Sequence, residues 1–183
     1  MPFSPDLFNY KKENYGDQVK GDIGFSGFRI HYPFNSPDFK DELVSFLGAS
    51  YFRALGRNHF YGLSARGLAV NTGEDIGEEF PVFKEFWIIR PSFFSNSITI
   101  YALMDSVSLT GAYEFIIRPG AQTVMDVKCT IFIREPVRKL GIAPLTSMFC
   151  FGEHSDEMKN GDFRPEVHDS DGLLIHANSG EWI

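Results

Sequence analysis

The sequence predicts an all-β protein built as a sandwich of sheets. Hydrophobic residues make up 43% of the 183 residues, which is enough for a core, and charged residues make up 22%. Aromatic residues, which favour strands, reach 15% and include 19 phenylalanines. Apolar runs recur about every 8 to 15 residues with turn signals between them, a spacing typical of sandwiches. We therefore expect about nine strands and hardly any helix.

The beginning of the chain predicts an irregular lead-in, one strand and one short helix. Residues 1–24 are rich in Pro, Lys, Asp and Gly. Residues 25–32 alternate between apolar and polar side chains, which indicates a strand. Ser36 followed by Pro37 is a helix-start signal, so we expect a short helix over 36–41.

The next two apolar runs predict neighbouring strands. Residues 43–55 are strand-like and aromatic, with Gly48 as a bulge or a close backbone approach. After a turn at 57–59, residues 60–70 return as a second strand that carries several small residues. Small residues leave space above a sheet, and we expect four larger polar side chains to project into it: Tyr51, Arg53, Tyr61 and Arg66.

The remainder of the chain predicts the other strands. Residues 98–105 alternate cleanly, with Ile98, Ile100, Ala102 and Met104 on one face and Thr99, Tyr101 and Leu103 on the other. Further strands are expected over 80–90, 111–118, 123–134, 145–151 and 173–183. The last of these stops on large apolar residues without a terminating loop, so we expect the chain to be cut short.

Charge and composition exclude several classes of partner. The net charge is −7, and the sequence has no block of Lys and Arg, so nucleic acid and anionic membrane surfaces are poor partners. No run is long enough to span a membrane, and the start lacks the features of a signal peptide. Cys129 and Cys150 are equally compatible with a disulfide and with two buried thiols.

Two acidic clusters are the main candidates for chemistry. The first holds Glu74, Asp75, Glu78 and Glu79; the second holds Glu166, Asp169 and Asp171, with His168 beside them. Glycoside hydrolysis needs two carboxylates in opposite protonation states, and an aromatic all-β scaffold with two acidic loops is compatible with it. Acidic loops are more often simply solvated turns.

Other kinds of site are disfavoured by their missing residues. The run Asp169-Ser170-Asp171-Gly172 is part of a calcium-loop pattern, but Val167 and Asn178 stand where further oxygen ligands are needed. We therefore expect no metal site. The sequence contains no phosphate loop, dinucleotide fingerprint or serine-hydrolase elbow, and we expect no cofactor.

Five motifs follow one another along the chain. They are Gly48-Ala49-Ser50-Tyr51-Phe52-Arg53-Ala54, Tyr61-Gly62-Leu63-Ser64-Ala65-Arg66-Gly67-Leu68-Ala69, Gly77-Glu78-Glu79-Phe80-Pro81, Ala143-Pro144-Leu145-Thr146-Ser147-Met148-Phe149 and Arg164-Pro165-Glu166-Val167-His168-Asp169-Ser170-Asp171-Gly172. In this order they resemble the periplasmic glucan biosynthesis proteins of the OpgG/OpgD (MdoG) type. The likeness runs from near Asp6 to the last residue.

The resemblance implies a periplasmic protein that acts in the synthesis of osmoregulated periplasmic glucans. It implies that residues 1–183 form part of an N-terminal glucan-processing domain, a galactose-mutarotase-like β-sandwich (supersandwich) that is incomplete in this chain. On the same resemblance, we expect the family's C-terminal immunoglobulin-like domain to be absent from this chain. An incomplete sandwich exposes unpaired edges and apolar faces, so we expect the isolated chain to fold poorly.

The resemblance also implies a reaction and its residues. Members of the OpgD type resemble inverting endo-β-1,2-glucanases, in which one carboxylic acid protonates the glycosidic oxygen and a base activates water on the far side. Carried over by motif, the acid is Asp169, and the candidates for the base are Glu79 and then Glu78. The implied glucan-binding residues are Tyr51, Arg53, Tyr61, Arg66 and Trp87, with His168 and Asp171 supporting Asp169.

The sequence leaves two other functions open. The same groove would also serve a non-catalytic glucan-binding scaffold that assists the membrane glucan synthase, or the chain would be a purely structural β domain without glucan affinity. The implied partners are a β-glucan polysaccharide and this membrane synthase. Whether two copies form a homodimer is not fixed by the sequence.

Overall fold

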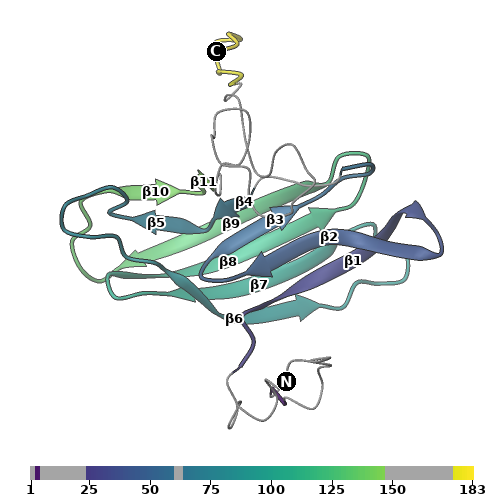
Figure 1. Cartoon of the computed structure of the whole chain (residues 1–183), viewed down its shortest axis with the longest axis horizontal. Coiled ribbons are helices and arrows are strands. Elements are labelled where there is room, and N and C mark those ends of the chain that lie inside the picture. The colour runs from purple at the N-terminus through teal and green to yellow at the C-terminus, as the bar shows by residue number, and fades with distance from the viewer. Residues whose placement is uncertain (1–2, 5–23, 60–63, 147–174) are drawn as a thin grey trace, which may run out of the picture.

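The computed structural model describes residues 3–4, 24–59, 64–146 and 175–183 (Figure 1). Within these residues the regular elements are eleven strands, arranged in three antiparallel sheets, so the predicted all-β class is confirmed. The described part of the chain holds no helix with the length and hydrophobicity that a bilayer crossing requires.

Two large sheets stack on each other and form the sandwich (Figure 1). The five-stranded sheet has the order β1 (Gly27–Ser36), β2 (Phe39–Leu47), β3 (Tyr51–Ala54), β4 (Ser64–Arg66) and β11 (Leu145–Thr146). The four-stranded sheet has the order β6 (Val82–Ile89), β7 (Ile98–Asp105), β8 (Leu109–Arg118) and β9 (Val124–Ile133). A small third sheet pairs β5 (Leu68–Val70) with β10 (Leu140–Ile142).

The core between the large sheets is built from phenylalanine rings. Phe46 on β2 is 1% exposed and contacts Phe28, Phe86 and Phe115 with ring centroids 5.1, 5.3 and 5.0 Å apart. Each well-placed aromatic pair adds about 0.5–1.5 kcal/mol beyond its area burial. The predicted alternation of β7 is also confirmed, because Ile100, Ala102 and Met104 are buried in this core. Eight aromatic residues of the described ranges belong to this core or pack against it, whereas ten others are exposed.

The expected helix over 36–41 is wrong, because these residues form the hairpin turn between β1 and β2. Ser36 pairs with Phe39 as the last rung of the ladder. The Ser36 hydroxyl accepts a hydrogen bond of 3.2 Å from the backbone N–H of Asp38. A helix cap makes the same kind of local side-chain contact, so the sequence signal was real but belonged to a turn.

The run 43–55 contains a chain reversal instead of a bulge. Gly48 has φ +77°, which favours glycine, and residues 48–50 turn the chain between the antiparallel strands β2 and β3. Gly67 interrupts the next run and separates β4 from β5. A Cβ added at Gly67 would lie 3.1 Å from the Phe83 ring. The backbone N–H of Gly67 donates a hydrogen bond of 2.8 Å to the Ser50 carbonyl. The backbone therefore passes close to the core at Gly67.

The expected final strand over 173–183 is also wrong for the residues that the structure describes. Residues 175–183 form a tight hairpin with one bridge, between His176 and Trp182. The ring of His176 stacks on Trp182, with centroids 4.4 Å apart, and Ile175 and Ile183 exchange two backbone hydrogen bonds of 2.8 and 2.9 Å. The reversal at 178–179 uses the Asn-Ser-Gly sequence that favours turns.

Candidate functional site

The outer face of the five-stranded sheet gathers three of the predicted glucan-binding residues. Successive side chains of a strand point to opposite faces, and Phe52 packs into the core. Tyr51 and Arg53 therefore point outward. The register pairs Tyr51 with Arg66 and Arg53 with Ser64, so the two strands present these side chains side by side. We call this surface, with Arg29, Glu42, Glu78 and Phe80, the arginine face.

Arg66 is the most enclosed charged residue of the arginine face. Its side chain is 9% exposed, and Nη1 donates to Oε1 of Glu78 at 2.6 Å. Its guanidinium carbon lies 4.8 Å from the centre of the Phe80 ring and 5.6 Å from that of Tyr51, which places the cation against two aromatic faces. Thr72 also donates to Oε1 of Glu78, at 3.2 Å. Arg66 is therefore fixed before any ligand arrives.

A second charged group lies beside it on the same face. Arg53 donates to one oxygen of Glu42 through Nε at 3.1 Å and Nη2 at 2.6 Å, and Arg29 Nε lies 3.4 Å from the other oxygen. The Glu42 side chain is 17% exposed, whereas that of Arg29 is 54% exposed. Among the described residues, two guanidiniums thus share the carboxylate of Glu42, and the exposed Arg29 directs hydrogen-bond donors to the surface.

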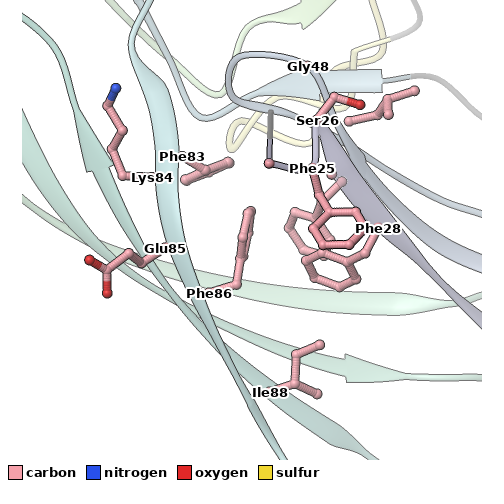
Figure 2. Close-up of a pocket in the computed structure, with 13 residues that line it drawn as sticks. Phe25, Ser26, Phe28, Gly48, Phe83, Lys84, Glu85, Phe86 and Ile88 are labelled. Carbon is pink, nitrogen blue, oxygen red and sulfur yellow. The ribbon is translucent and has the colours of Figure 1, made fainter. Parts of the chain in front are cut away.

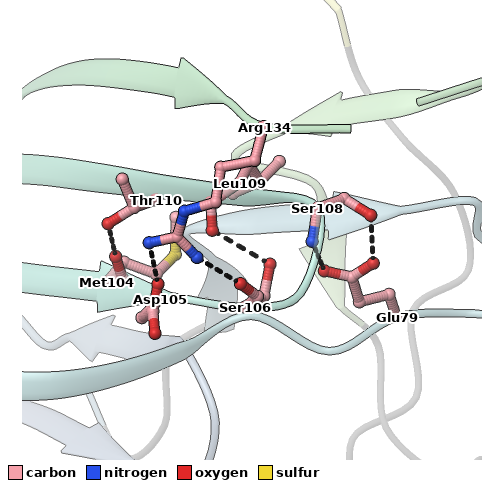
Figure 3. A network of polar contacts seen from close by, with 8 residues as sticks. All are labelled: Glu79, Met104, Asp105, Ser106, Ser108, Leu109, Thr110 and Arg134. Carbon is pink, nitrogen blue, oxygen red and sulfur yellow. Dashed lines mark hydrogen bonds and ion pairs between the residues drawn. The ribbon is translucent and has the colours of Figure 1, made fainter. Parts of the chain in front are cut away.

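Glu79 points away from the arginine face. Its backbone N–H pairs with Val70, and its carboxylate accepts from the Ser108 N–H at 2.8 Å and from the Ser108 hydroxyl at 2.6 Å (Figure 3). Burial alone would raise the pKa of Glu79, but hydrogen bonds from Ser106 and Ser108 outweigh it and lower the pKa. Glu79 is thus an ionised anchor for the turn between β7 and β8.

The same turn is braced by Arg134 (Figure 3). Its guanidinium donates to the Ser106 carbonyl at 2.8 Å and to Asp105 at 2.7 Å. Thr110 donates to the Met104 carbonyl at 2.7 Å on the other side of the turn. The turn that Glu79 holds is therefore a rigid polar junction at one end of the sandwich.

The remaining carboxylates of the first acidic cluster are ion-paired as well. Glu74 lies 2.8 Å from Nζ of Lys139, and Asp75 lies 3.3 Å from Nη1 of Arg138. Both partners lie directly before β10, so the loop after β5 is tied to the strand that pairs with it. All four acidic side chains of this loop, including Glu78 and Glu79, serve contacts within the protein.

Trp87 lies on the other side of the molecule from the arginine face. Its neighbour Phe86 packs against Phe46 in the core, so Trp87 points outward from the four-stranded sheet, where it pairs with Tyr101. The structure therefore separates Trp87 from Tyr51, with both layers of the sandwich between them. A single groove does not contain both side chains.

A pocket of about 720 Å³ opens between the edge strands β1 and β6 (Figure 2). Phenylalanine rings dominate it, among them Phe25, Phe28 and Phe86, while Lys84 and Glu85 lie at its margin. The pocket opens at the unclosed side of the core, and its lining contains none of the sequence-predicted glucan-binding or catalytic residues.

Four predicted site residues lie outside the residues that the structure describes: Tyr61, His168, Asp169 and Asp171. Their assigned roles stay predictions. The same holds for the pairing of Cys129 with Cys150, because Cys150 is also outside the described ranges.

Three residues of the arginine face were not predicted from the sequence: Arg29, Glu42 and Phe80. Glu42 joins Arg29 to Arg53, and Phe80 covers the guanidinium of Arg66. Phe80 carried a signal, because it belongs to the Gly77-Glu78-Glu79-Phe80-Pro81 motif and is an exposed aromatic residue beside two carboxylates. Glu42 carried none, since its role depends on the pairing of β2 with β1 and β3.

Comparison with known proteins agrees with the motifs. Residues 1–183 match the family described as "Periplasmic glucan biosynthesis protein, MdoG". The chain is similar to a protein from Ralstonia nicotianae (strain ATCC BAA-1114 / GMI1000) named "Glucans biosynthesis protein G", with 56% identity over 181 residues. That alignment covers 99% of this chain and 36% of the relative, so the chain spans about a third of the length of the protein it matches.

Proposed function

Because the chain belongs to the MdoG family of periplasmic glucan biosynthesis proteins, we propose that the full-length protein acts in the periplasm in the synthesis of osmoregulated periplasmic glucans. The substrate is a β-1,2-glucan backbone, which binds on the arginine face. The observation that carries this proposal is the enclosure of Arg66 by Glu78, Tyr51 and Phe80.

The chemistry of the arginine face suits a neutral sugar chain. Tyr51 is half-buried and the Phe80 ring is 51% exposed, so aromatic surface is available for the apolar faces of pyranose rings. Arg29, whose side chain is 54% exposed, supplies donors for sugar hydroxyls, and Glu42 and Glu78 supply acceptors. Because these side chains already hold one another, little side-chain entropy is lost when a glucan binds.

We assign the reaction as inverting endo-hydrolysis of the glucan backbone. Asp169 acts as the acid that protonates the glycosidic oxygen, and a second carboxylate activates water from the opposite side at a carboxyl separation of about 6.5–9.5 Å. Of the two candidates for the base, Glu78 is the better supported, since it lies on the arginine face. Glu79 is engaged by Ser108 on both oxygens.

The second candidate function is a glucan-binding scaffold that assists the membrane glucan synthase without cleaving the chain. One observation favours it: the carboxylates of the loop Glu74–Glu79 all serve internal contacts, as structural residues do. The relative's name, which speaks of glucan biosynthesis, is compatible with either function.

Incubation of the full-length protein with linear β-1,2-glucan tests the proposal, with released oligosaccharides measured by chromatography and binding measured by calorimetry. We expect release by the wild type, none by Asp169→Asn, and a loss of at least about a hundredfold in Glu78→Gln, as for removal of a general base. Glu79→Gln is the matched control and should retain turnover. Binding without release in the wild type would select the scaffold, and absence of binding would defeat both functions.

A further inference from the structure

The outer face of the four-stranded sheet carries one continuous row of side chains. Trp87 on β6 pairs with Tyr101 on β7, Tyr101 with Glu114 on β8, and Glu114 with Lys128 on β9. Neighbouring strands lie about 4.8 Å apart, so the row crosses the sheet over roughly 14 Å. We call these four residues the aromatic row.

Both ends of the aromatic row are open to solvent. Trp87 is 48% exposed and Tyr101 is 42% exposed, and Lys128 at the other end is exposed. Glu114 is the cross-strand partner of Tyr101, and hydrogen bonding to its carboxylate, together with its negative charge, raises the pKa of Tyr101. The row thus presents two aromatic side chains at one end, followed by an anionic acceptor and a cationic donor.

This order of groups matches one kind of ligand better than others. A pyranose chain presents apolar C–H faces that stack on aromatic rings and hydroxyl edges that bond to carboxylates and ammonium groups. An anionic ligand would meet the charge of Glu114, and an apolar protein surface would have to desolvate both Glu114 and Lys128. A neutral polysaccharide meets neither cost, because its hydroxyls both donate and accept.

We propose that the aromatic row is a second glucan-binding surface, separate from the arginine face. This inference rests on the proposed function, in that the ligand is the same β-1,2-glucan. The two surfaces lie on opposite outer faces of the sandwich with the phenylalanine core between them. One molecule can therefore hold two stretches of a long glucan, and attachment at the aromatic row raises the local concentration of glucan near the arginine face.

The test uses calorimetric titration of the full-length protein with short linear β-1,2-glucan oligosaccharides and with long chains. We expect the Trp87→Ala and Tyr101→Ala double variant to lose one binding event for short oligosaccharides. We also expect it to bind long chains about tenfold more weakly, the cost of about 1.4 kcal/mol of lost stacking. The single variant Trp87→Phe keeps a ring at this position and should retain most of the wild-type affinity for long chains.

The matched control is Phe132→Ala, which removes an exposed ring from the same outer face but from a different cross-strand row, where Phe132 pairs with Thr110. It should leave both binding events intact. The proposal is overturned if the double variant binds like the wild type while Tyr51→Ala abolishes binding, a result under which the proposed function still stands. Absence of any glucan binding in the wild type would remove the proposed function and this inference together.

Discussion

The two outer faces of the sandwich are built from the same strand alternation but are prepared differently for a ligand. On the arginine face, charged side chains hold one another: Arg66 with Glu78, and Arg53 and Arg29 with Glu42. On the opposite face, Trp87 and Tyr101 stand about half exposed. One surface is organised by internal ion pairs, and the other offers open aromatic rings.

From this difference we infer how each face would bind a glucan. Groups that are already fixed by neighbours bind with little loss of freedom and favour one ligand geometry, which is what a reaction site needs. Open rings stack on any sugar unit that reaches them and favour affinity over position. We therefore expect the arginine face to decide where a glucan is processed and the aromatic row to decide how long the glucan stays bound.

A variant of the shared core should have the largest effect, because both faces depend on this core. Phe46 is fully buried among Phe28, Phe86 and Phe115, and Phe46→Ala should lower the free energy of unfolding by about 3–5 kcal/mol through lost packing and the cavity left behind. Chemical denaturation of the full-length protein measures this. Glucan binding at both faces should decline together as the variant unfolds.

The control for this core variant is Phe94→Ala. Phe94 is 93% exposed in the loop between β6 and β7, so its removal should change the free energy of unfolding by no more than about 0.5 kcal/mol. If Phe46→Ala were as mild as Phe94→Ala, the two faces would not share one packed layer, and the separation argued for Trp87 and Tyr51 would lose its basis.

Disruption of the arginine face should have the next largest effect and should spare the aromatic row. Glu78→Ala leaves the Arg66 guanidinium, whose side chain is 9% exposed, without its ion-pair partner. We expect a loss of about 2–4 kcal/mol in the free energy of unfolding, somewhat below the cost of breaking a fully buried pair because Glu78 is 24% exposed. Thermal and denaturant unfolding measure the loss.

A double-mutant cycle with Arg66→Ala separates the ion pair from the packing of each residue. Arg66→Lys is the sharper comparison, since lysine keeps the charge but loses the planar group that lies over Tyr51 and Phe80. Arg66→Ala and Arg66→Lys should both weaken glucan binding at the arginine face and leave glucan binding at the aromatic row unchanged. Equal weakening of the two events would show that the faces are not independent.

The sequence predicted faces better than it predicted neighbours. Alternation identified the buried side of β7 correctly, because a period of two depends on local residues alone. Tyr51 and Arg66 were expected to project into one space from neighbouring strands, but the reversal at Gly48 that makes them cross-strand partners read as a bulge or a close backbone approach. Trp87 shows the limit: the resemblance placed it in one groove with Tyr51, whereas it points outward from the opposite sheet.

The local turn chemistry shows the same limit. Ser36 makes the side-chain contact that the sequence indicated, yet the contact closes a hairpin because β2 continues the ladder of β1. Glu79 was ranked first as the base because of its motif, and only the fold of the turn between β7 and β8 brings Ser108 to its carboxylate. Asp169, on which the proposed reaction depends, lies outside the described residues and rests on its motif.

The smallest effect concerns Glu79, which belongs to neither outer face. Its pKa in the folded protein is lowered from an ordinary value of 4.5. Its ionised carboxylate therefore stabilises the fold above about pH 4.5, and this contribution is lost as the pH falls through the lowered pKa. We expect Glu79→Gln to have a lower free energy of unfolding than the wild type at pH 7, by less than about 1 kcal/mol because water screens this carboxylate. The resulting gap in melting temperature between the two proteins should close toward pH 3.

Melting curves of both proteins between pH 7 and pH 3 measure this gap, with Asp75→Asn as the exposed control whose gap should be near zero throughout. The Asp75 side chain is 86% exposed and its ion pair is long, at 3.3 Å. A gap for Glu79→Gln that widened toward acid would contradict the anchoring role, because it would mean that the protonated carboxyl is the stabilising form. Loss of glucan turnover in Glu79→Gln without any change in melting would instead return Glu79 to the reaction and leave Glu78 as part of the arginine face alone.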